Sequence, residues 1–151
     1  MCATVTDAKR VPLRWERREF TDSGTVQHNV DCVEAATWTV KQGRHYLRYE
    51  EAEGGTFTTL CLDRQELTLV RHGEVTWNCA FRPGHETAST MHAHGLVFGV
   101  RVQTKSFEAE FNQEGGRLAL SYRLWLNADS EEVQQEVLVI VMFGNFVNQS
   151  T

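Results

Sequence analysis

Apolar residues stand at every second position along most of the chain, and this restricts the fold more than any other feature of the sequence. Residues 118–126 show it most clearly, with Leu, Leu, Tyr, Leu and Leu alternating with other residues. Successive side chains of a β-strand point to opposite faces, so this spacing is typical of a strand with one buried face. The chain is therefore predicted to be built from β-strands.

Short stretches containing Gly, Asp, Asn or Pro separate these segments, as expected for turns between successive hairpins. The pattern predicts strands at residues 11–18, 30–40, 46–49, 57–62, 66–72, 75–81, 96–103, 118–126 and 137–143. The last of these has no alternation and is rich in β-branched residues, which predicts a strand covered on both sides.

Residues 130–138 allow a second interpretation. Ser130 followed by two glutamates could begin a helix, whereas residues 127–130 also suit a hairpin loop. We favour the hairpin because strand patterns flank it. A long meander exposes edge strands unless it closes on itself, so we predict an all-β fold: a single antiparallel meander β-barrel of about 8–10 strands.

The length of 151 residues suits one domain with one core. We expect a single β-barrel domain over residues 1–151, with a loose N-terminal segment at 1–9 and a C-terminal tail at 144–151. The net charge of −5 is dispersed along the chain, which argues against nucleic acid as a partner. No apolar run approaches the about 18 residues of a membrane span, and the first residues lack a signal-peptide pattern, so we expect a cytoplasmic protein without membrane contact.

The four cysteines, Cys2, Cys32, Cys61 and Cys79, include no Cys-x-x-Cys pair. Neither a zinc site nor a disulfide scaffold is indicated by this spacing. In a reducing compartment we expect them to be buried small residues or idle thiols.

Several segments, read together, carry a family resemblance. They are Tyr-Leu-Arg-Tyr-Glu-Glu at 46–51, Leu-Val-Arg-His-Gly at 69–73, Phe-Gly at 98–99, Thr-Lys-Ser at 104–106 and Gly-Arg-Leu-Ala-Leu-Ser-Tyr at 116–122. In their order the chain resembles the uncharacterised YwiB-like β-barrel family of bacterial cytoplasmic proteins, over about residues 44–143. The resemblance implies a calycin-like or lipocalin-like barrel and brings no established activity, substrate or cofactor. The histidines at 92 and 94 depart from the family's usual residues there.

His92 and His94 are two residues apart, so on a strand both rings would share one face, where they could hold a divalent metal with His85 as a third ligand. A pair without its remaining ligands is a weak metal signal. The alternative is that the histidines are solvated side chains at a strand end, and we predict no cofactor.

Tyr46 and Arg48 also share a face, and a guanidinium with a phenol can hold a ligand carboxylate inside a barrel. The alternative places Arg48 outside, paired with Glu50. Trp77, Phe98 and Tyr122 lie at apolar positions of the alternation, where they could line a ligand cavity or fill the core.

Catalytic motifs are not apparent. No Gly-x-Ser-x-Gly turn or phosphate-binding glycine loop is present. The adjacent acids Glu50-Glu51 and Glu131-Glu132 would point to opposite faces, so we interpret them as solvated charge.

The leading hypothesis is a non-enzymatic barrel that binds a small apolar or carboxylated ligand through Tyr46, Arg48, Trp77, Phe98 and Tyr122. It requires a cavity of a few hundred cubic ångströms. An alternative is a protein–protein interaction barrel or homodimer with a packed interior and an exposed apolar patch. The third hypothesis is a metal-dependent enzyme that uses His92, His94 and His85.

Overall fold

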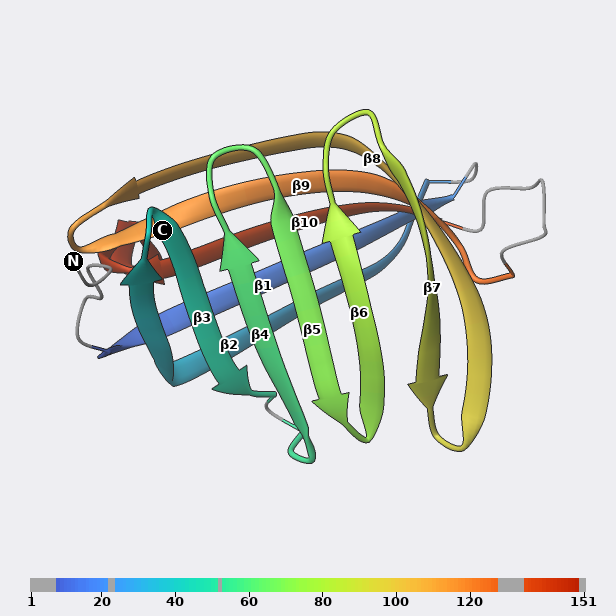
Figure 1. Cartoon of the computed structure of the whole chain (residues 1–151), viewed down its shortest axis with the longest axis horizontal. Helices are drawn as coiled ribbons and strands as arrows, with labels where there is room; N and C mark the ends of the chain where they lie inside the picture. Colours follow the sequence, from blue (N-terminus) through green and yellow to red (C-terminus); the bar gives the residue numbers. More distant parts are fainter. Residues whose placement is uncertain (1–7, 22–23, 52, 128–134, 150–151) are drawn as a thin grey trace.

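Ten antiparallel strands follow one another along the chain and close into a barrel in a computed structural model that describes residues 8–21, 24–51, 53–127 and 135–149 (Figure 1). The strands are β1 (Lys9–Thr21), β2 (Gly24–Lys41), β3 (Arg44–Glu50), β4 (Thr56–Leu62), β5 (Leu67–Gly73), β6 (Val75–Phe81), β7 (Glu86–Ala93), β8 (Leu96–Asn112), β9 (Gly115–Trp125) and β10 (Gln135–Gly144). Each strand pairs with its neighbours in sequence, and β1 closes the barrel against β10 over eight residue pairs. The predicted all-β meander barrel is confirmed.

The meander gives the barrel two distinct ends. Odd-numbered strands end at one end of the barrel, which we call the Arg71 end. Even-numbered strands end at the other, which we call the His45 end and where β1 begins (Figure 1). An inward side chain therefore lies near one end of the barrel or the other according to its position along its strand.

Inward-pointing side chains fill the middle of the barrel with apolar groups. The largest that are almost fully buried are Phe81, Phe143, Leu13, Leu47, Leu60, Leu62, Leu67, Leu118 and Leu120. Burial of one such side chain stabilises a fold by roughly 1.5–3 kcal/mol. This apolar layer separates the two ends of the interior.

β8 changes its inward parity partway along. Its pairing with β9 shifts between Thr104 and Ser106, so the extra residue forms a β-bulge. Before the bulge Val102 and Thr104 are buried, and after it Phe107 takes the inward position. The bulge lets one long strand keep a buried face although its sequence parity switches.

The wall of the barrel opens between β6 and β7. Their ladder covers only Val75–Ala93 and Thr76–His92, and the strands then diverge (Figure 1). Side chains bridge the opening: Trp77 Nε1 donates to Ser89 Oγ at 2.8 Å. A strand at 86–93 was not among those predicted, because its inward positions are mostly small or polar.

β10 differs from the prediction that it is covered on both sides. Its inward residues are buried, whereas the outward Leu138, Ile140 and Met142 are only half-buried. Met142, Ile140 and Leu138 pair with the outward residues Arg14, Glu16 and Arg18 of β1. The aliphatic parts of those charged side chains flank the three apolar residues. The outer face of β10 is therefore shielded by side chains of the neighbouring strand instead of by a second layer.

The chain ends also differ from expectation. Lys9, placed in the loose segment 1–9, begins β1, and the expected tail contains the 3₁₀-helix η1 (Asn145–Gln149). Asn145 N donates to the Glu114 carbonyl at 3.0 Å, which ties η1 to the β8–β9 turn. Of the helix alternative at 130–138, residues 130–134 lie outside the described residues, and residues 135–138 belong to β10. No helix in the described part of the chain is long and apolar enough to cross a membrane.

Gly116 provides a test of this packing. It pairs with Phe143 on one side and Phe111 on the other, and a Cβ there would come within 2.6 Å of the Phe143 ring and 2.8 Å of the Glu110 carbonyl oxygen. We expect Gly116→Ala to lower the free energy of unfolding by about 1–3 kcal/mol, because a packed core has no room for the added methyl group. Denaturant unfolding measures this.

Arg117→Ala, one residue further and facing outward, is the control. We expect it to change stability by less than about 0.5 kcal/mol. Equal effects of the two substitutions would contradict the packing described for β9.

Candidate functional site

A row of inward side chains crosses four neighbouring strands near the Arg71 end. The register pairs Tyr49 with Thr58, Thr58 with Arg71, and Arg71 with Trp77. Paired residues on adjacent strands project from the same face. The fold therefore brings a phenol, a hydroxyl, a guanidinium and an indole side by side on the inner wall.

Glu51 completes this row from just beyond the end of β3. Arg71 donates to it twice, from Nε to Oε2 at 2.8 Å and from Nη2 to Oε1 at 2.7 Å, and Thr58 Oγ1 donates to Oε2 at 2.6 Å. This two-bonded fork fixes both partners in orientation as well as in charge. About a quarter of each side chain is exposed, 27% for Arg71 and 24% for Glu51.

A second polar group faces the first from the opposite wall. Glu19 on β1 pairs across the ladder with Val137, and Val137 pairs with Tyr122 on β9. Glu19 is ion-paired with Arg17 and accepts a hydrogen bond from Gln135 Nε2 at 2.9 Å. It is only 6% exposed, so a full negative charge is held inside the barrel.

These two groups border an interior cavity of about 390 Å³ at the Arg71 end. Aromatic and aliphatic side chains make up most of the remaining wall: Trp15, Leu69, Trp77, Phe81, Met91, Leu120, Leu124, Leu126 and Val139. The cavity is thus apolar over much of its surface, with two ion pairs whose four charges cancel.

The environment sets the protonation of these groups. Burial alone would raise the pKa of Glu51, but the hydrogen bonds from Arg71 and Thr58 outweigh it and lower that pKa below its usual value. Burial raises the pKa of Tyr49, and the negative charges of Glu51 and Asp31 raise it further. Burial likewise raises the pKa of Tyr122, which is also hydrogen-bonded to Arg17. At neutral pH Glu51 is therefore ionised, and Tyr49 and Tyr122 are protonated.

The structure separates the predicted ligand residues into two groups. Trp77 and Tyr122 line the cavity. Tyr46 and Arg48 project outside the barrel, since the inward positions of β3 are those of Leu47 and Tyr49, and Arg48 lies 6.0 Å from the exposed Phe57 ring. The idea of an interior clamp made by Tyr46 and Arg48 is wrong for this reason. Phe98 is partly buried and packs against the core beside its cross-strand partner Met91.

The three histidines do not share a strand face. His92 is exposed near the end of β7, and His94 lies in the turn after that strand with φ of 53°. His85 precedes β7, about 25 Å away along an eight-residue strand. Across the described residues, no three His, Cys, Asp or Glu side chains gather closely enough to hold a metal ion.

Sequence reasoning missed Arg17, Glu19, Glu51 and Arg71. Arg17 and Glu19 continue the inward parity of Leu13 and Trp15, but the predicted strand was followed only to residue 18 and neither residue was considered as an interior group. Glu51 was interpreted as solvated charge because Glu50 precedes it. The parity signal was present in β1, and only the closed barrel shows that it leads inside.

The low pKa of Glu51 predicts a pH effect on stability. A carboxylate whose pKa is lower in the folded state stabilises the fold above its unfolded pKa of about 4.3, and this contribution disappears as pH falls through the folded pKa. We expect Glu51→Gln to lower stability at pH 7 and to lose less stability than the parent between about pH 5 and pH 3.

Denaturant unfolding across that pH range measures the effect. Glu50→Gln, the neighbouring substitution on the outer face, should leave the acid profile of the parent unchanged. Identical profiles for both variants would show that Glu51 is not held by Arg71 in solution.

Comparisons with known proteins agree with this fold. A family model described as a domain of unknown function, DUF1934, matches residues 17–140. The crystal structure of the YwiB protein from Bacillus subtilis superposes with a TM-score of 0.79, at 18% identity, over 93% of this chain and 94% of that one. No curated protein matches the chain.

The segments that carry the family resemblance also supply Tyr49, Glu51, Arg71 and Tyr122 to the cavity. The expected relation to YwiB is confirmed, and the chain belongs to the DUF1934 family of β-barrel domains.

Proposed function

We propose that the barrel is a non-enzymatic binding protein for a small, largely apolar molecule carrying one carboxylate or similar oxygen group. The observation that carries this proposal is the interior cavity of about 390 Å³, whose apolar walls surround paired arginines and glutamates. Ligand pockets in proteins usually span roughly 300–1,000 Å³ and combine apolar walls with a few placed polar groups. The cavity at the Arg71 end fits both criteria.

Arg71 supplies the polar anchor. A guanidinium has five N–H donors, and Glu51 accepts from two of its nitrogens, Nε and Nη2. The other donors could bind a ligand oxygen while the ion pair stays intact. Trp77 and Met91 would then contact the apolar part of the ligand.

The state of the carboxylates favours binding over acid–base catalysis. An efficient general acid or base has a pKa near the working pH. The pKa of Glu51 is lowered instead, and both its oxygens accept hydrogen bonds from Arg71. These features suit a fixed polar anchor better than a proton-transfer group.

The distribution of exposed apolar residues supports an interior site over a protein interface. Among the described residues the large ones are Val30 on β2, Phe57 on β4, Leu96 and Val97 at the start of β8, and Leu126 after β9. Apart from the adjacent Leu96 and Val97 they lie on different parts of the chain, whereas an interface needs a contiguous patch. A cytoplasmic location is part of the proposal, supported by three free cysteines at positions 32, 61 and 79.

Native mass spectrometry of gently purified protein, followed by calorimetric titration, tests the proposal. The probes are octanoate and decanoate, with octanol as the uncharged analogue. We expect octanoate to bind more tightly than octanol by roughly tenfold or more, because a charge-assisted hydrogen bond contributes about 1.5–3 kcal/mol.

Arg71→Lys should weaken octanoate binding by at least about fivefold, since a lysine cannot hold Glu51 in a fork and a ligand oxygen together. Arg48→Lys makes the same chemical change on the outer face and should bind like the parent. Equal weakening in the two variants, or no binding of either carboxylate and no retained mass, would rule out this site.

A further inference from the structure

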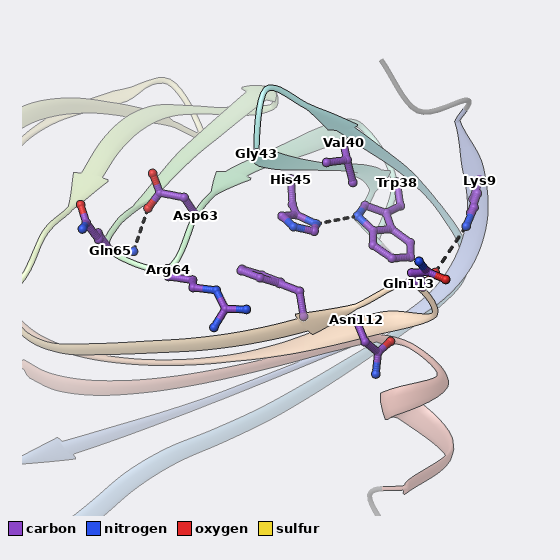
Figure 2. A pocket seen from close by; sticks show the side chains of 11 residues that line it. Lys9, Trp38, Val40, Gly43, His45, Asp63, Arg64, Gln65, Asn112 and Gln113 are labelled. Carbon is purple, nitrogen blue, oxygen red and sulfur yellow. Dashed lines mark hydrogen bonds between the residues drawn. The ribbon is translucent and has the colours of Figure 1, made fainter. Parts of the chain in front are cut away.

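A second cavity lies at the His45 end of the barrel, on the far side of the apolar middle layer (Figure 2). It measures about 840 Å³ and is lined by residues from the start of β1, the end of β2, the start of β3, the β4–β5 turn and the end of β8 with the turn that follows. It shares no lining residue with the Arg71-end cavity. The two cavities are separate sites.

Three aromatic rings, Trp38, His45 and Phe111, pack together in the lining of this second cavity, and we call them the ring cluster. Trp38 Nε1 donates to His45 Nδ1 at 3.1 Å, and the two rings are nearly parallel, at 17° (Figure 2). His45 stacks on Phe111 with ring centroids 4.0 Å apart. Phe143 packs edge-on against Trp38 from the core side, at 5.1 Å. The rings are therefore held in place before any ligand arrives.

His45 is neutral in this arrangement. Burial lowers its pKa, and the positive charge of Arg64 lowers it further. Its Nδ1 accepts the proton of Trp38, so Nε2 carries the ring hydrogen. The ring cluster is therefore aromatic and uncharged.

Two cations lie on opposite sides of the ring cluster. Lys9 Nζ lies 5.5 Å from the Trp38 ring centre, and the Arg64 guanidinium lies 6.0 Å from that of Phe111 (Figure 2). The lining contains one carboxylate, Asp63, whose Oδ1 accepts from the Gln65 and Glu66 amides at 2.7 and 3.0 Å. Among the described lining residues, cations therefore outnumber carboxylates by two to one.

We propose that this second cavity binds a planar aromatic molecule that bears an oxyanion, either carboxylate or phosphate. The aromatic ring would contact the cluster of Trp38, His45 and Phe111, and the oxyanion would bind Lys9 or Arg64, which lie on opposite sides of that cluster. Both contacts are needed, because aromatic packing favours a planar ring and a cation favours the negatively charged group.

Titration of the full chain with 2-naphthoate and 2-naphthyl phosphate, followed by calorimetry and tryptophan fluorescence, tests this site. The uncharged analogue is 2-naphthylmethanol, and inorganic phosphate tests the anion alone. We expect at least one naphthyl anion to bind roughly tenfold more tightly than 2-naphthylmethanol and inorganic phosphate. The tighter of the two anions then identifies the oxyanion.

Either Lys9→Gln or Arg64→Gln should weaken binding of the naphthyl anion by about three- to tenfold, and the variant that does so identifies the cation that binds the oxyanion. Both side chains are exposed, so neither substitution should unfold the protein, and thermal unfolding checks this. Arg10→Gln is the matched control, because Arg10 follows Lys9 in β1 and points to the other face of the strand. Arg71→Lys should leave this binding unchanged, which separates it from ligand binding at the Arg71 end.

Equal binding of 2-naphthylmethanol and the anions would overturn the proposal, as would equal binding of inorganic phosphate. Lys9→Gln and Arg64→Gln variants that behave like Arg10→Gln would also overturn it.

Discussion

Closure of the barrel between β1 and β10 is the constraint from which the rest of this structure follows. Eight residue pairs, from Leu13–Phe143 to Phe20–Glu136, join the first strand to the last. Once they pair, every second side chain of each strand is confined to a limited interior. Leucine, valine and phenylalanine fill the middle of the interior, and the two cavities described above lie at its ends.

The two ends use that room in chemically different ways. The Arg71 end holds two ion pairs that cancel in charge, inside apolar walls. The cavity at the His45 end has the larger volume, and it contains an uncharged cluster of aromatic rings with more cations than carboxylates around it. A buried ion pair often contributes little net stability, because the loss of hydration offsets the attraction between the charges. The proposed ligand site gives Arg17, Glu19, Glu51 and Arg71 a role that stability alone does not supply.

Much of the fold could be predicted from the sequence, because alternation marks strands directly. Leu118, Leu120 and Tyr122 show a strand with one buried face, and Tyr122 does line the cavity. β7 was not predicted because its inward residues, among them Thr87 and Ser89, are not apolar and instead form side-chain hydrogen bonds across the opening to β6.

The candidate site was harder to predict for a physical reason. Charged residues are rarely buried, so Arg17, Glu19 and Arg71 were not considered as interior residues although their parity matched their apolar neighbours. Glu51 lies beyond the end of its strand, where alternation no longer indicates a face. Tyr46 and Arg48 show the reverse case: their chemistry suits a ligand carboxylate, but the parity of Leu47 and Tyr49 places them outside.

The central claim is that the interior charges serve recognition, and an apolar replacement of one ion pair tests it most directly. In the double variant Glu51→Leu with Arg71→Met, denaturant unfolding and octanoate titration are measured together. We expect a free energy of unfolding equal to or up to about 2 kcal/mol above that of the parent, with octanoate binding lost. A double variant destabilised by several kcal/mol, or one that binds octanoate as the parent does, would contradict it.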